Sequence, residues 1–403
     1  MRHDLPIYAS IRKEALISQV MNDTVKRPAA RVEFIPAGYA TPYDIAFTSF
    51  EITQRTGAID AFSLSIPGNE PIWDMVLLRP FSTGLASDRL KFYVEFGGWE
   101  LPIFQGIPME KRDAWPPPTR GAGEEGWRGG DDPITLTGHG LLGLLKHVDG
   151  MYYGTANLYG TEPIPFTGDI VGLIRYFLWK ANLYGSIIDL PSYGSGLPYH
   201  IKEPMDINYS DGYQAVTSLA ANIHPAGMIM VTPEGQVRVR RGRGPDWFEE
   251  SFNYSDIYDE DTRGFARLMH FERTWRHLEV VTKCMVIWKE GAEVVESSAL
   301  KAVYGTQPRT LHLPMVETAG DARQAAQAVI DDSNRWDAAL TATVNPYLHV
   351  GSVIRVRPRM GGSGQARRVE VVGRQVNVTV EGGEITVSET LQCRALELGQ
   401  EWL

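Results

Sequence analysis

The sequence predicts a mainly β protein in which two similar small antiparallel β-barrels flank a small α+β domain. Three observations predict this class. The 403 residues include 40 glycines and 25 prolines, so turns are frequent and the elements between them are short. Apolar and polar residues alternate in short runs toward both ends of the chain. In the middle, apolar residues recur at the three- and four-residue spacing of helices.

The first barrel is predicted over residues 31–150, after an N-terminal arm of residues 1–30. Its first three strands are expected at 31–36, 46–54 and 61–66, where apolar residues alternate with polar or small ones. LKFYVEF and WELPIFQGI follow, joined by two glycines, which is typical of a tight hairpin. A polar loop, WPPPTRGAGEEGWRGGDD, then leads to the strand ITLTGHG and the helical LLGLLKHV.

The α+β middle domain is predicted over residues 151–265. Thr167 is expected to cap a helix with apolar residues on one face, and Ser210 to cap a second helix. After the second helix, MIMV and QVRVR are separated by Thr-Pro-Glu-Gly, which predicts a hairpin.

The second barrel is predicted over residues 266–403. Strands are expected near 274–288 and 293–297, followed by a helix that Thr318 and Asp321 begin with a variant of the capping box. Near the C-terminus, VNVTV and EITVSE flank Glu-Gly-Gly and predict a hairpin with a short loop.

A phrase in the first barrel is similar to one in the second. NEPIWDMVLLRP spans 69–80 and NPYLHVGSVIRVRP spans 345–358. Each begins with Asn, continues with Pro and large apolar residues, and closes an aliphatic run with Arg-Pro. The match is short, so both an internal repeat and a chance similarity stay open.

Composition limits the classes of function. The formal net charge of -10 argues against general affinity for nucleic-acid phosphates. Two cysteines without a CxxC pattern argue against a disulfide framework or a zinc site and favour a reduced cytosolic origin. The N-terminus lacks the apolar core of a secretory signal, and the most apolar helical stretch is too short to span a membrane.

No motif supports catalysis, metal binding or cofactor binding, and the chain is predicted not to be an enzyme. Ser298 and Lys301 have the SxxK spacing of penicillin-recognising enzymes, but the other motifs of those enzymes are missing. His139 and His147 lack a nearby third metal ligand. The carboxylates of the 115–132 loop lie among glycines, which favours a solvated loop over a rigid glycosidase site.

Two features are candidates for contact with a partner. VRVRRGRG is the strong basic cluster of an acidic protein, and a solvated face, an acidic neighbouring subunit and DNA all stay open as explanations. The 115–132 loop carries two tryptophans that a solvated loop has no reason to expose. The candidate interface residues are therefore Trp115, Trp127, Arg238, Arg240, Arg241 and Arg243.

Four stretches resemble the hub proteins of phage tails and related contractile injection machines, the group that includes phage late control protein D and baseplate hub proteins. They are RVEFIPAGYATPYDIAFTSFEITQRTGAIDAFSLSI, with the hairpin ending in FQGI; SDGYQAVTSLAANIHPAGMIMVTPEGQVRVR; DARQAAQAVIDDSNRWDAALTATV; and NPYLHVGSVIRV. Together they cover most of residues 31–360, in the order that such proteins show.

The resemblance implies a tail-hub architecture: a homotrimer whose six barrels form a ring between the tail tube and the tip. It implies a tail tube or distal tail ring protein, a tip, spike or fibre protein, and a tape-measure protein in the lumen as partners, and DNA that passes through without specific binding. The chain would belong to the virion, at the tail tip, and be assembled in the cytoplasm of the bacterial host. The alternative is a β-sandwich protein that binds or hydrolyses cell-wall glycan, which requires a cleft with two close carboxylates.

Overall fold

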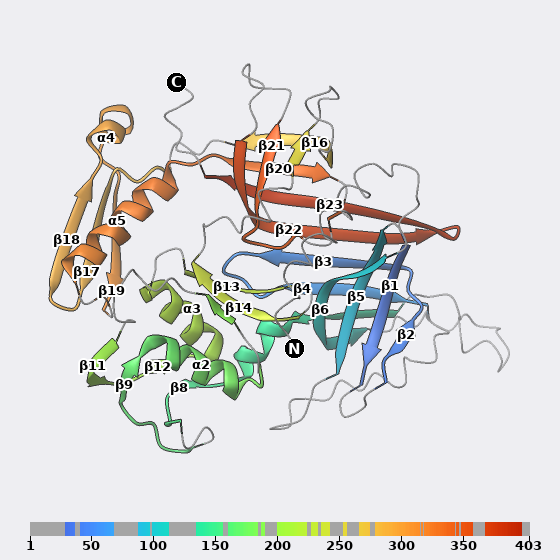
Figure 1. Cartoon of the computed structure of the whole chain (residues 1–403), viewed down its shortest axis with the longest axis horizontal. Helices are drawn as coiled ribbons and strands as arrows, with labels where there is room; N and C mark the ends of the chain where they lie inside the picture. Colours follow the sequence, from blue (N-terminus) through green and yellow to red (C-terminus); the bar gives the residue numbers. More distant parts are fainter. Residues whose placement is uncertain are drawn as a thin grey trace, which may run out of the picture.

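The protein is mainly β with an α+β insertion, which confirms the predicted fold class (Figure 1). The computed structural model describes residues 29–36, 41–67, 88–96, 99–112, 134–155, 160–183, 187–189, 200–223, 227–232, 235–241, 253–255, 266–274, 279–314, 316, 318–342, 344–345, 348–357 and 367–396. Within these ranges every helix is too short or too polar to cross a membrane. The four domain boundaries expected from the sequence stay a prediction.

One sheet of 13 strands joins the two ends of the chain. Its strand order is β2-β1-β5-β6-β7-β4-β3-β22-β21-β15-β16-β20-β23, and β22 also pairs with β23. The strands are β1 (Ala29–Ile35), β2 (Tyr43–Ile45), β3 (Ser49–Arg55), β4 (Ala61–Ile66), β5 (Arg89–Phe96), β6 (Trp99–Arg112), β7 (Ile134–Gly140), β15 (Asn253–Ser255), β16 (Ala266–Thr274), β20 (Asp337–Ala342), β21 (Val353–Arg357), β22 (Arg367–Glu381) and β23 (Glu384–Ala395).

The first barrel consists of β1 to β7 around an aromatic core. Alternation along β4 buries one face of the strand and leaves serines on the other, as the sequence predicted. Phe92 lies at the centre, with ring centroids 5.1 Å from Phe50 and 5.3 Å from Phe62. Val376 and Val378 of β22 belong to the same core, so the hairpin of β22 and β23 contributes part of the interior of the first barrel.

The second barrel is closed by backbone pairing. Its six strands follow the circuit β22-β21-β15-β16-β20-β23, and β23 returns to β22. The interior is aliphatic, with Leu340, Ile354 and Leu391 fully buried. Closure is partial at β15, which is short and pairs with β16 only at Ala266 and Arg267.

The two barrels have the same strand order. In chain order β1, β3, β4, β5, β6 and β7 correspond to β15, β16, β20, β21, β22 and β23, and the order across the sheet is then identical. One strand departs from this scheme, because β1 is antiparallel to β5 whereas β15 is parallel to β21. The phrase at 69–80 lies outside the described residues, so its equivalence to 345–358 stays a prediction.

The barrels are fused edge to edge by β3 and β22, which lie side by side in Figure 1. Residues 49–55 of β3 pair antiparallel with residues 373–379 of β22. The N-terminal half of β22 instead pairs with β21 of the second barrel. A single long strand therefore serves both barrels, and its hairpin with β23 runs across their junction.

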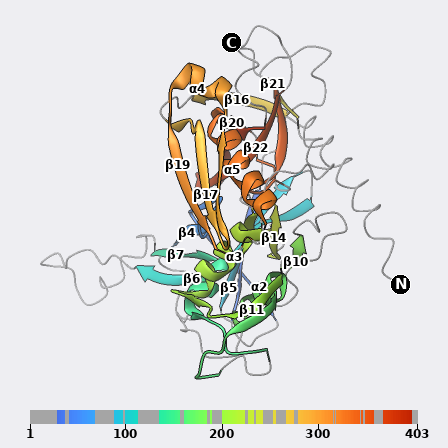
Figure 2. The same ribbon diagram turned by 90° about the vertical axis from the view of Figure 1, so that its left-hand side faces the viewer.

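An insertion separates β16 from β20 and forms its own small unit. It has the sheet β18 (Gly291–Glu296), β17 (Lys283–Trp288) and β19 (Pro308–Leu313), with helices α4 (Ser298–Tyr304) and α5 (Ala319–Ser333). Helix α5 lies against this sheet (Figure 2) and buries Ala322 and Ala326 on Cys284 and Val286. Thr318 caps α5 by accepting from the Asp321 N–H, as predicted.

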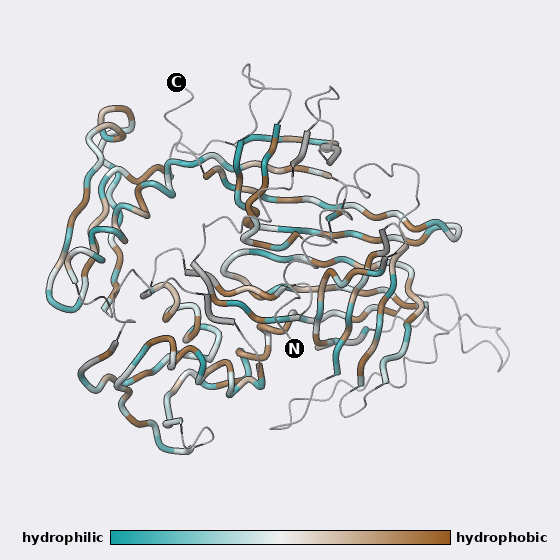
Figure 3. The backbone as a smooth tube through the Cα atoms, viewed as in Figure 1, coloured by the Kyte–Doolittle hydropathy of each residue, from teal (hydrophilic) through white to brown (hydrophobic). Residues whose placement is uncertain are grey.

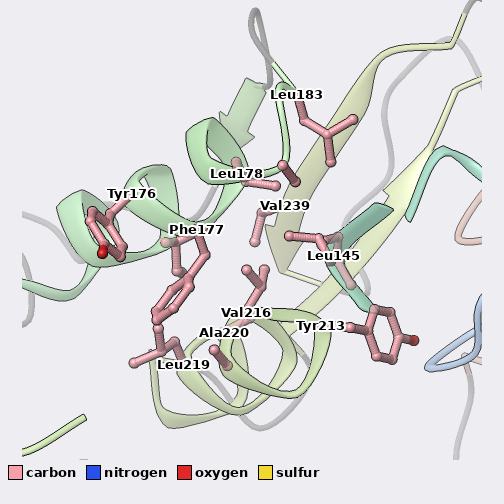
Figure 4. Packing of buried hydrophobic residues seen from close by; sticks show 14 of the residues in the cluster. Leu145, Tyr176, Phe177, Leu178, Leu183, Tyr213, Val216, Leu219, Ala220 and Val239 are labelled. Carbon is pink, nitrogen blue, oxygen red and sulfur yellow. The ribbon is translucent and has the colours of Figure 1, made fainter. Parts of the chain in front are cut away.

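The middle domain packs α2 (Ile170–Lys180) against α3 (Gly212–Ile223), and Figure 4 shows Phe177 of α2 facing Val216 and Leu219 of α3. The 3-10 helix η3 (Leu141–His147) completes this core. Short strands surround it: β8 (Gly150–Met151), β9 (Phe166–Asp169), β10 (Ile187–Asp189), β11 (His200–Met205), β12 (Asn208–Tyr209), β13 (Gly227–Val231) and β14 (Val237–Arg241). The predicted MIMV–QVRVR hairpin is the pair β13–β14.

Both predicted caps of the middle helices are wrong. Asp169, not Thr167, caps α2, because its carboxylate accepts from the Val171 N–H at 3.0 Å. At the start of α3 the Asp211 carboxylate accepts from the Gln214 N–H at 2.8 Å, while the Ser210 hydroxyl binds the Gln214 side chain. In each case an aspartate one or two residues after the predicted cap accepts the hydrogen bond from a free N–H group of the first helical turn in place of the predicted hydroxyl.

We expect Gly138→Ala to destabilise the protein by roughly 1–3 kcal/mol, the usual cost of overpacking. A Cβ at this position would lie 2.0 Å from the Ile107 carbonyl oxygen and 2.6 Å from the Phe62 ring. Gly172→Ala is the control, because nothing lies within 4 Å of a Cβ on that exposed helical residue, and it should stabilise by roughly 0.5–1 kcal/mol. Thermal unfolding of both variants tests this; equal Tm shifts would contradict it.

Candidate assembly and channel surfaces

One face of the fused sheet carries mostly small polar side chains where the two barrels meet. Residues opposite one another on paired strands share a face, so the registers define rows that cross β23, β22, β3, β4 and β7. The rows are Thr390, Gln375, Thr53, Ala61, His139; Ser388, Asn377, Glu51, Ser63, Thr137; and Thr386, Thr379, Ser49, Ser65, Thr135. We call these residues the polar face; the alternation is visible along β3, β4 and β22 in Figure 3.

The polar face is nearly uncharged. Glu51 is its one carboxylate, and it accepts a hydrogen bond from the Gln375 amide at 2.9 Å across the barrel junction. A depression of about 410 Å³ lies on the same face, lined by Glu51, Ser63, Thr137 and the exposed Met109 among others. On these five strands, hydroxyl and amide groups bind water well. The adjoining strand β6 adds Glu110, which also lines the depression, and its ion-pair partner Arg112 to the same face.

Two long strands of the fused sheet, β6 and β16, each leave part of an edge unpaired among the described residues. Beyond Gly106, strand β6 pairs with β7 on one side only. Beyond Arg267, strand β16 pairs with β20 on one side only. Each edge carries an exposed methionine, with Met109 42% and Met269 56% exposed. Unpaired edges with apolar residues are templates for pairing with another chain.

A buried ion pair holds the segment between β20 and β21. Arg374 and Glu389 are 1% and 0% exposed, and the guanidinium donates to the carboxylate. Arg374 also donates to the carbonyls of Leu348 at 2.6 Å and Asn345 at 3.0 Å, and Glu389 accepts from the Asn345 N–H at 2.9 Å. The pair therefore holds Asn345 and Leu348, two residues of the 345–358 phrase, in place.

A second buried acid lies where the first barrel meets the middle domain. The Asp60 carboxylate accepts from the Gln54 amide at 3.2 Å, and its backbone carbonyl accepts from the Gly140 N–H at the start of η3. Burial raises the pKa of Asp60 to about 7, against the lowering effect of the hydrogen bonds and of Arg374. Burial, with Asp60 nearby, also raises the pKa of Tyr213 in α3 to about 12.

The solved structures most informative for this geometry are phage tail proteins. A tail protein from Neisseria meningitidis superposes with a TM-score of 0.57 at 12% identity, over 93% of this chain and 98% of that one. The 43 kDa tail protein of prophage MuSo2 from Shewanella oneidensis gives 0.55 at 13% identity, over 93% and 100%. The chain has the fold of phage tail proteins.

A structure of the Francisella PdpA–VgrG complex contains the same tail-protein fold. It superposes with a TM-score of 0.50 at 10% identity, over 97% of this chain and 56% of that one. No protein-family model and no curated protein matches the sequence. The likeness therefore lies in the tail-protein fold and not in the sequence.

The structure describes three of the six residues predicted as an interface. Arg238, Arg240 and Arg241 lie on β14, which pairs antiparallel with β13 and parallel with β10. Val237 and Val239 of that strand are buried, so Arg238 lies on the opposite face, half-buried. Trp115, Trp127 and Arg243 lie outside the described residues, as do the loop carboxylates. The interface prediction for all six residues stays a prediction.

A larger pocket of the tail-protein fold, about 670 Å³, lies between the insertion and the second barrel. Arg394 on its wall bonds Asp332 and Asp337, each at 3.3 Å, so opposite charges are matched across the pocket. Within the described part of the chain, no three His, Cys, Asp or Glu side chains are grouped to hold a metal ion. Cys284 and Cys393 are buried free thiols in different units.

Sequence reasoning missed the polar face and the two edges. A signal for them is present: FEIT at 50–53 on β3 and FERT at 271–274 on β16 occupy equivalent strands of the two barrels. The register agrees, because Phe50 pairs with Leu64 and Phe271 pairs with Leu340. Comparison of these two short runs would have aligned the barrels.

Proposed function

We propose that this chain is the structural hub of a phage tail, a homotrimer whose six barrels form a pseudo-hexameric ring between the tail tube and the tip. The observation that supports this most is the fusion of two barrels of equal strand order by β3 and β22. Two equivalent units side by side in one chain let three chains build a ring with sixfold character. Such a ring can adjoin a sixfold tube on one side and a threefold tip on the other.

The polar face is the wall of the channel in this proposal. It runs without interruption from one barrel to the next. In a ring built by adding further barrels in the same way, the face would continue around the whole channel. Its serines, threonines and amides, with an overall charge of -10, would let DNA and a tape-measure protein pass without being retained. The flanking partners are a tube or distal ring protein and a tip, spike or fibre protein, and the role is mechanical rather than enzymatic.

Light scattering coupled to gel filtration tests the assembly. We expect a particle of three times the chain mass at micromolar concentration, and ring-shaped particles with a central hole in averaged electron micrographs. Antibody labelling should place the chain at the tail tip of purified virions. A protein that stays monomeric at every concentration and under tail-assembly conditions would contradict the proposal.

A further inference from the structure

We infer that the ring closes by repeating between copies the strand pairing that joins the barrels within one chain: β16 of one copy pairs with β6 of the next. The inference deepens the proposed function, on which it rests, by naming the surface through which a second copy of this chain binds. Within the chain, β3 of the first barrel pairs with β22 of the second. The equivalents of these two strands are β16 and β6.

The equivalence of β3 and β16 is fixed residue by residue. Phe50 lies opposite Leu64 of β4, and Phe271 lies opposite Leu340 of β20. In the same registers Thr53 lies opposite Ala61, and Thr274 lies opposite Asp337, the first residues of the equivalent strands β4 and β20. Thr274 is therefore the counterpart of Thr53.

The equivalence of β6 and β22 is fixed by a shared bulge. The register of β22 against β23 shifts between Val371 and Gly373, and that of β6 against β7 shifts between Pro108 and Glu110. Bulges of this kind are specific features of a strand rather than accidents. Aligned on the bulge, Arg112 is the counterpart of Gln375.

Beyond its bulge, β22 uses the outer edge to bind the neighbouring barrel. Gln375 lies opposite Thr53, and the carbonyl of the bulged Val372 accepts from the Thr56 N–H at 2.9 Å and hydroxyl at 3.1 Å. The same edge of β6 is unpaired among the described strands, and so is the facing edge of β16. The transferred register places Arg112 opposite Thr274 of the next copy.

Side-chain chemistry agrees with this pairing. Met109 is the counterpart of the bulged Val372, and its exposure falls on the edge that a neighbour would cover. Met269 is exposed on the other edge. Glu272 precedes Thr274 by two residues and so shares its face, diagonal to Arg112, where the opposite charge is favourable. Burying two methionines at a strand pair stabilises the contact by the hydrophobic effect.

Cysteine crosslinking tests the register. The variant R112C/T274C carries the inferred pair, and T53C/Q375C is the matched control because it places the same pair within one chain. Under mild oxidation, R112C/T274C should give disulfide-linked dimers and trimers on denaturing gels, dispersed by reductant, whereas T53C/Q375C should form an intrachain bond in the monomer band. R112C/R273C, shifted by one residue to the opposite face, should form far less product.

Single variants distinguish specific pairing from collision. R112C alone and T274C alone should stay uncrosslinked, while their mixture should give a heterodimer as the copies exchange. The native thiols of Cys284 and Cys393 are buried and should give no background.

The outcomes separate this inference from the proposed function. If the protein is trimeric by mass and T53C/Q375C closes, yet R112C/T274C gives no interchain product, the ring closes through another surface and the inference is wrong. If the shifted pair crosslinks as well as the inferred one, the register is wrong. A chain that never assembles contradicts both statements.

Discussion

Replacing Arg374 with methionine should lower the free energy of unfolding by about 3–5 kcal/mol, because it leaves the Glu389 carboxylate buried without its cation. The change also removes the donors that satisfy the carbonyls of Asn345 and Leu348. Urea denaturation, followed by fluorescence and circular dichroism, measures the loss.

Two further variants make the Arg374 prediction specific. Arg374→Met combined with Glu389→Leu should recover at least half of the loss, since neither charge then stays buried. Arg323→Met is the exposed control: Arg323 pairs with Glu293 at 2.7 Å but is 65% exposed, so its loss should cost under about 1 kcal/mol. Equal losses for Arg374→Met and Arg323→Met would show that the buried pair contributes no more than a surface pair.

Replacing Asp60 with asparagine should stabilise the protein at pH 8 and have little effect near pH 4. The pKa of Asp60 is about 7 in the folded protein and 3.8 ordinarily, so the folded state binds the proton more tightly. Stability from this group is therefore greatest below pH 4 and falls as pH rises toward 7. At about 1.4 kcal/mol per pKa unit, the loss is on the order of 4 kcal/mol, which asparagine avoids because it does not ionise.

Urea midpoints of the parent and D60N between pH 4 and 8 test this, with D211N as a control of opposite sign. Burial favours a higher pKa for Asp211, but the hydrogen bond from the Gln214 N–H and the ion pair with Lys146 outweigh burial and lower that pKa. D211N should therefore weaken the protein near neutral pH and lose that effect in acid. If D60N weakens the protein equally at every pH, the pKa of Asp60 does not differ between the folded and unfolded states and the prediction is wrong.

Local features of the fold were predictable from sequence because their causes are local. Gly382 and Gly383 adopt φ of 59° and 82°, the left-handed values that a two-residue hairpin turn requires and glycine permits, and they join β22 to β23 as predicted. Thr318 begins α5 as predicted. The starts of α2 and α3 were displaced because several polar residues competed for each cap and spacing alone does not rank them.

Non-local features were not predictable in the same way. The pairing of β3 with β22 joins segments that are far apart in sequence. The alternation of apolar and polar residues along a strand does not indicate which other strand it pairs with. The insertion of β17 to β19 and α5 was expected within the second barrel, because its strands alternate like those of a barrel. The polar face depends on the registers of five strands. The sequence of each strand alone predicts only an ordinary half-exposed strand.

The shared β22–β23 hairpin has a consequence for biosynthesis. Translation produces β1 to β7 early, whereas Val376 and Val378 of β22, and Ile385 and Val387 of β23 packed beside them, are synthesised only near the C-terminal end of the chain. Until then Phe50 and Ile52 of the nascent chain lie in an incomplete hydrophobic core. Association with another incompletely folded chain then competes with correct folding. Folding of the first barrel is therefore completed only once β22 and β23 have been synthesised, and formation of the β22–β23 hairpin is the step that commits both barrels together.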